Sequence, residues 1–150
     1  MLKIERSVTI NAPVDRVFEY VSNPRNLPEI WPSLIEVKDV RDLPNGGKRF
    51  AFTYKMAGFR FEGISEDVEY VRPDHLSIKT TGGVESTFLW KFVPTGQETR
   101  VTLTVNYTIP GALLGKLAEP FIARQNEHEN ELLLNNLKLR LEQPAPTTIR

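Results

Sequence analysis

The sequence predicts an α+β fold in which a curved antiparallel sheet of about seven strands wraps around one long C-terminal helix. Runs with alternating apolar and polar residues recur through most of the chain before residue 110. Tight-turn sequences such as Asn45-Gly46 join these runs, so that neighbouring strands must be antiparallel. Only the segment 111–142 is long enough to cover the apolar face of such a sheet.

The first strand and two short helices precede the main run of strands. Residues 3–10 alternate and predict a strand with one buried face. An amphipathic helix follows, because apolar residues recur at helical spacing at Val14, Val17, Phe18 and Val21. A second short helix or turn occupies residues 25–31 and closes at Trp31-Pro32. Trp31 either plugs a corner of the fold or guards the mouth of a pocket.

Six further strands are predicted, at 34–43, 48–56, 59–71, 76–80, 84–93 and 100–109. Gly63 lies inside one of them and predicts a bulge or bend, as a curved sheet requires. The apolar face is rich in large rings, contributed by Phe50, Phe52, Tyr54, Phe59, Phe61, Phe88, Trp90, Phe92 and Tyr107. Such rings either pack closely or, held apart by a single helix, enclose a cavity suited to an apolar ligand.

The C-terminal helix carries a mixed face. On a helical wheel one stripe contains Leu114, Ala118, Phe121, Leu132 and Leu139. Gln125 falls in the middle of this stripe, and His128 and Glu129 lie at its edges. These polar groups form the rim of a packed face, or they face a pocket. Pro120 either kinks the helix or marks its true start.

Composition narrows the function. The 150 residues include 19 basic and 19 acidic side chains and no cysteine. A neutral balance argues against a nucleic-acid surface, and the absence of cysteine excludes disulfides and thiolate chemistry. No apolar run could span a membrane, so a cytoplasmic protein is expected. His128-Glu129 begins a segment without the second histidine of a zinc motif, and neither a metal nor a cofactor is predicted.

Four segments carry a resemblance to a known superfamily: residues 10–18, 23–32, 99–107 and 133–142. They resemble the helix-grip fold of the SRPBCC superfamily, which includes the START lipid-transfer domains and the birch pollen allergen family. The closest likeness is to the bacterial polyketide cyclase/dehydrase family. The resemblance implies a single helix-grip domain over residues 1–142, followed by a flexible tail at 143–150.

The predicted function is binding of a small hydrophobic ligand, such as a lipid, quinone or polyketide-like compound, between the sheet and the long helix. The predicted ligand-binding residues are Trp31, Phe52, Tyr54, Phe61, Ile78, Ser86, Phe88, Trp90, Tyr107, Phe121 and Gln125. One alternative is an enzyme resembling polyketide cyclases, with proton transfer by Gln125, His128, Glu129, Ser86 or Tyr54. Another is an accessory interaction subunit resembling the membrane-recruitment subunit of carbon monoxide dehydrogenase. No catalytic residue is assigned, and the sequence does not indicate the oligomeric state.

Overall fold

The computed structural model describes residues 2–56, 58–109 and 118–143. The predicted order of elements is confirmed. The elements are β1 (Leu2–Ile10), α1 (Val14–Ser22), the 3-10 turn η1 (Pro24–Asn26), α2 (Leu27–Ile30), β2 (Leu34–Asp42), β3 (Lys48–Met56), β4 (Phe59–Val71), β5 (His75–Gly82), β6 (Ser86–Thr95), β7 (Glu98–Tyr107) and α3 (Ala118–Glu142). The predicted domain limit at residue 142 stays a prediction, and residues 144–150 lie outside the described part of the chain.

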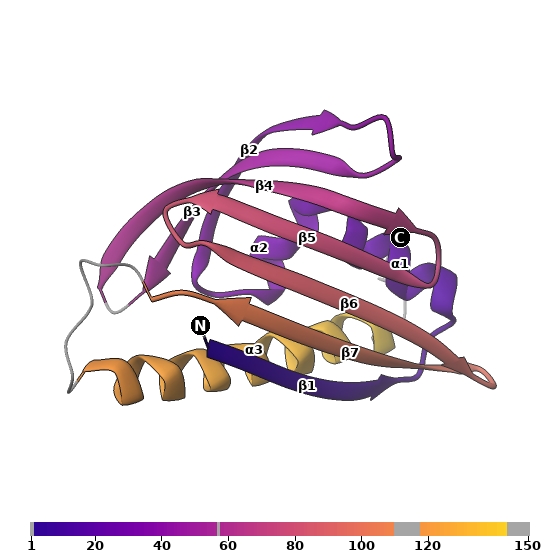
Figure 1. The fold of residues 1–150 in the computed structure, drawn as a ribbon. Coiled ribbons are helices and arrows are strands. Elements are labelled where there is room, and N and C mark those ends of the chain that lie inside the picture. The colour runs from indigo at the N-terminus through magenta and orange to yellow at the C-terminus, as the bar shows by residue number, and fades with distance from the viewer. Residues whose placement is uncertain (1, 57, 110–117, 144–150) are drawn as a thin grey trace, which may run out of the picture.

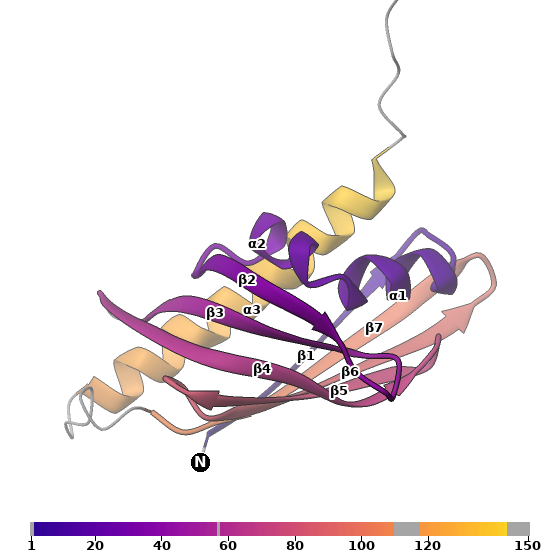
Figure 2. The ribbon, with the colours of Figure 1, turned by 90° about the horizontal axis from the view of Figure 1, so that it is seen from above.

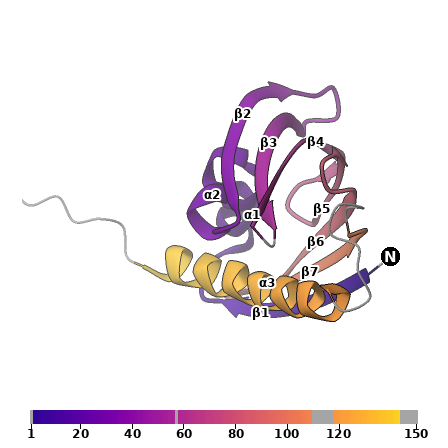
Figure 3. The same cartoon turned by 90° about the vertical axis from the view of Figure 1, so that its left-hand side faces the viewer.

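All seven strands form one antiparallel sheet in the order β1-β7-β6-β5-β4-β3-β2. The chain therefore meanders from β2 to β7 and places β1 beside the last strand (Figure 1). Seen end-on, the sheet curls around an open side along which α3 runs, close to β1 (Figure 3). This arrangement confirms the predicted helix-grip fold.

The predicted bulge at Gly63 is wrong. Gly63 pairs in regular register with Phe52 on one side and Gly82 on the other, and the irregularity in β4 falls between Asp67 and Glu69. Glycine is needed at position 63 for close approach. A Cβ atom there would lie 2.4 Å from the Thr81 carbonyl oxygen and 2.8 Å from Cζ of Phe52. The glycine thus lets the Phe52 ring lie flat over the neighbouring strand.

The long helix is fixed to the rest of the fold mainly through its C-terminal half. Asn136 Nδ2 donates to the Ile30 carbonyl (3.1 Å), Lys138 Nζ donates to the Thr9 carbonyl (2.9 Å), and Glu142 Oε2 accepts from the Asn11 amide (2.7 Å). Pro120 lies in the first turn of α3, where the missing amide proton costs no helical bond. Residues 111–117 of the predicted helix lie outside the described residues.

The dense core lies under the C-terminal half of α3, with α1 and α2 on the same side of the sheet (Figure 2). From α3 it takes Leu133, Leu137 and Leu141, all buried. From α1 it takes the predicted stripe, in which Phe18 is fully buried and meets Tyr70 and Phe92 edge-to-face. The N-terminal half of α3 instead turns two asparagines, Asn126 and Asn130, toward the sheet.

Candidate functional site

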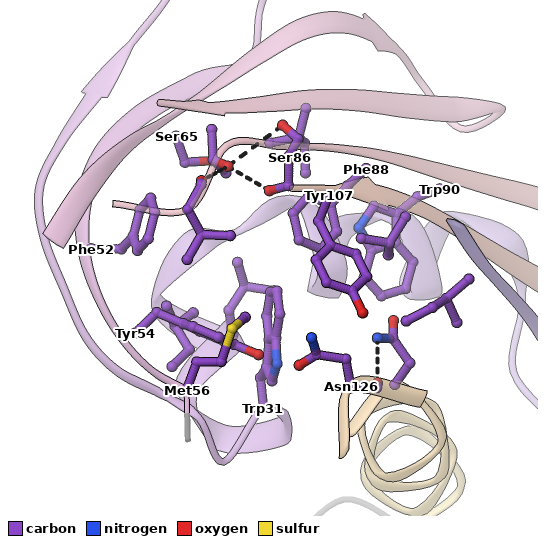
Figure 4. Close-up of a pocket in the computed structure, with 18 of the residues that line it drawn as sticks. Trp31, Phe52, Tyr54, Met56, Ser65, Ser86, Phe88, Trp90, Tyr107 and Asn126 are labelled. Atoms are coloured by element: carbon purple, nitrogen blue, oxygen red, sulfur yellow. Dashed lines mark hydrogen bonds between the residues drawn. The ribbon is translucent and has the colours of Figure 1, made fainter. Parts of the chain in front are cut away.

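A cavity lies between the concave face of the sheet and the N-terminal half of α3 (Figure 4). Its volume is about 70 Å³, counted for the centres of water molecules. At about 10–15 Å³ for one water, this is room for roughly five. Its walls include these predicted residues: Trp31, Phe52, Tyr54, Ile78, Ser86, Phe88, Trp90 and Tyr107. The predicted inner face of the sheet is therefore correct, and the rings leave an internal space.

Aromatic rings build one wall from distant parts of the chain. Trp31, directly after α2, meets Tyr54 of β3 and Phe88 of β6 edge-to-face, with ring centroids 5.5 and 5.3 Å apart. The alternation along each strand turns Tyr54 and Phe88 inward, and the end of α2 carries Trp31 between them. Trp31 is only half-buried, so it stands at the edge of the cavity.

Polar groups on the sheet side of the cavity are bonded to one another. The hydroxyls of Thr80 and Ser86 lie 2.5 Å apart, and Thr80 Oγ1 donates to the Val84 carbonyl at 2.7 Å. These bonds tie the neighbouring strands β5 and β6 together at the cavity wall (Figure 4). Their hydrogen-bonding capacity is largely used within the protein, so they act mainly as part of the wall.

Polar groups on the helix side are different. Asn126 and Asn130 are 8% and 6% exposed, and both line the cavity. Asn130 Nδ2 donates to the Asn126 carbonyl (2.9 Å), which leaves Asn130 Oδ1 without a partner, and Asn126 Nδ2 has none either. A buried polar atom without a partner costs about 1–3 kcal/mol. The protein thus keeps an unpaired acceptor and an unpaired donor facing an otherwise apolar space.

Phe121 and Gln125 do not line the cavity, which corrects two of the predicted site residues. Phe121 is 58% exposed, and both side chains border an open outer cleft between α3 and the end of β3. The predicted helix stripe was rotated by about one residue, or 100°. The true inner face runs through Ile122, Asn126, Asn130, Leu133, Leu137 and Leu141. Its spacing of four, four, three, four and four residues was readable, but the two asparagines made it look polar.

Phe61 also lies outside the cavity wall. It pairs with Tyr54 in the β3–β4 register but is only half-buried, because it sits near the start of β4 at the open end of the sheet. The ionisable candidates lie outside too. His128 is exposed, and Glu129 accepts a hydrogen bond from the Ser33 amide at 2.8 Å, so both border the outer cleft. Met56 and Asn126 border both spaces and separate the cleft from the cavity.

The electrostatics of the cavity are those of a neutral site. Among the described residues that line it, none is an aspartate, glutamate, histidine, lysine or arginine. Burial, and secondarily the nearby Glu129 carboxylate, raise the pKa of the Tyr54 phenol well above its ordinary value. Tyr54 therefore remains a neutral hydrogen-bonding group at physiological pH. In the described parts of the chain no group of three or more histidine or acidic side chains could hold a metal ion.

Comparison with solved structures defines the class of protein. The chain is similar to the ZhuI aromatase/cyclase from Streptomyces sp. R1128, with a TM-score of 0.80 and 17% identity over 94% of this chain and 93% of that one. A START superfamily protein from Mycobacterium smegmatis gives a TM-score of 0.78 and 14% identity over 93% and 97% of the two chains. TTHA0849 from Thermus thermophilus gives 0.72 and 23% over 93% and 97%. These likenesses establish a START-like helix-grip protein.

The family follows from the sequence comparison. The model of the family described as polyketide cyclase/dehydrase and lipid transport matches residues 1–142, and the chain belongs to that family. The resemblance seen in the sequence is thereby confirmed. A search of curated proteins gave no match. Within the described residues, no helix combines the length and the apolar character needed to cross a membrane.

Proposed function

We propose that this protein binds a small hydrophobic molecule in the cavity between the sheet and α3. The observation that carries the proposal is the unpaired amide pair of Asn126 and Asn130 facing an aromatic, otherwise apolar space. Ligand sites of this kind combine apolar walls with a few convergent polar groups. A plain core position would be filled more stably by leucine, because a buried amide without partners costs free energy.

A cyclase or dehydrase activity is the alternative, and the likeness to the ZhuI aromatase/cyclase favours it at the level of the fold. Acid–base catalysis requires a proton-transfer group within hydrogen-bond reach of the substrate. His128 and Glu129 border the outer cleft, and the hydroxyls that line the cavity are phenols or aliphatic alcohols. We therefore favour binding. The predicted cytoplasmic location and the lipid, quinone or polyketide-like nature of the ligand stay predictions.

Native mass spectrometry of protein purified from its own host would test this proposal. We expect a complex heavier than the 17.1 kDa chain by the mass of one small organic molecule. The added mass should disappear under denaturing conditions. The variant Ser86→Phe, which puts a ring into the cavity, should lose it. A ligand-free wild-type protein that also binds none of a panel of lipids, quinones and polyphenols would overturn the proposal and favour an interaction subunit instead.

A further inference from the structure

Beyond apolar burial, α3 offers one donor and one acceptor to whatever occupies the cavity. Asn126 and Asn130 are four residues apart, so their side chains lie one above the other on the same helix face, about 6 Å apart. The bond from Asn130 Nδ2 to the Asn126 carbonyl fixes the amide of Asn130 and leaves its Oδ1 as the acceptor. Asn126 points from α3 into the space between Trp31 and Tyr107 (Figure 4).

A hydroxyl group fits both partners at once. It donates one hydrogen bond and accepts others, at about 2.8–3.0 Å from each partner. A hydroxyl oxygen between Asn130 Oδ1 and Asn126 Nδ2 would therefore bridge a separation close to the helical spacing of the two side chains. A ketone could satisfy only Asn126, and a hydrocarbon would leave both amides unpaired.

Charge narrows the ligand further. No charged side chain is found among the described residues of the cavity wall, so an anionic head group would be buried without a counter-ion. The Glu129 carboxylate, held at the cavity mouth by the Ser33 amide, adds repulsion for an anion that enters there. The available space of about 70 Å³ suits a compound of about one ring without rearrangement of the walls.

We infer that the ligand is a neutral compound with a hydroxyl group on a small ring or chain, and that this hydroxyl binds between Asn126 Nδ2 and Asn130 Oδ1. The inference rests on the proposed function and specifies its ligand class. The apolar part of the compound then lies against Phe88, Trp90 and the other rings of the sheet, and the helix-side amides set its orientation.

Three compounds of one shape test the inference by isothermal titration calorimetry: 4-ethylphenol, 4-ethyltoluene and 4-ethylbenzoate. We expect 4-ethylphenol to bind about tenfold more tightly than 4-ethyltoluene, because only the phenol pairs both amides. The benzoate should bind more weakly than either. Side-chain amide signals in a ¹H–¹⁵N spectrum, assigned by their loss in Asn126→Leu, should shift with the phenol and much less with the hydrocarbon.

Variants separate a ligand contact from a structural role. Asn126→Leu and the double variant Asn126→Leu/Asn130→Leu should reduce the tenfold preference for the phenol to about twofold or less while still binding 4-ethyltoluene. Asn135→Leu makes the same change on the exposed face of α3 and should keep the preference.

The outcomes distinguish the two proposals. Equal affinities for phenol and hydrocarbon in the wild type, tighter binding of the benzoate, or an unchanged preference in the double variant would overturn the hydroxyl inference and leave cavity binding intact. Absence of saturable binding for all three compounds would overturn cavity binding itself.

Discussion

Phe18 joins α1 to the end of the sheet, and its removal should destabilise the fold strongly. The ring is 0% exposed and packs edge-to-face on Tyr70 and Phe92 with centroids 5.2 and 5.3 Å away. Truncation of a buried phenylalanine to alanine typically costs about 3–5 kcal/mol, through lost burial and the cavity left behind. The two ring contacts place Phe18→Ala in the upper part of that range.

Equilibrium unfolding in urea measures this cost. For a slope of about 2 kcal/mol per M, a loss of about 4 kcal/mol lowers the midpoint by about 2 M with the slope unchanged. Phe59→Ala is the matched control, because that ring is 51% exposed and should shift the midpoint little. A loss below about 1 kcal/mol in Phe18→Ala would refute the tight packing of α1 on the sheet.

Two further substitutions test the sheet. Burial raises the pKa of Asp67 to about 6, although its carboxylate accepts a hydrogen bond from the Lys48 amide. The folded state therefore holds this proton more tightly than the unfolded chain, so its stabilising contribution is present below about pH 4 and is lost as the pH rises through 6. In urea unfolding, Asp67→Asn should gain about 1–3 kcal/mol on the wild type between pH 4 and 7, and a constant difference would contradict this. Gly63→Ala should lose about 1–3 kcal/mol in thermal unfolding, because its Cβ would meet the Thr81 carbonyl; a neutral result would show that the strands move apart freely.

The strands were predictable because each carries an unambiguous period of two. The inward residues Phe50, Phe52, Tyr54 and Met56 alternate with residues that need no burial, so a register error would have exposed a row of rings. The same alternation placed Phe88 and Trp90 on the cavity wall. Most of the cavity could therefore be assembled from sequence.

The phase of α3 was not predictable from apolar periodicity alone. Asn126 and Asn130 occupy its inner face, whereas Phe121 and Leu139 are 58% and 61% exposed, so hydrophobicity pointed about 100° away from the true direction. A site that keeps polar groups buried breaks the rule that locates a core. The role of Gly63 was hidden for another reason: it depends on the contact of Phe52 with a neighbouring strand, which no local pattern records.

Tryptophan fluorescence offers the most direct test of the cavity as a ligand site. The two tryptophans, Trp31 and Trp90, both line it, so an occupant must contact the reporters. Titration with the neutral quencher 2-methyl-1,4-naphthoquinone should give saturable quenching in the wild type and in Thr87→Phe, which adds a ring to the exposed face of the same strand. In Ser86→Phe the saturable phase should vanish while the unfolding midpoint changes little. Linear quenching in the wild type, or saturation that survives Ser86→Phe, would contradict the cavity as the binding site.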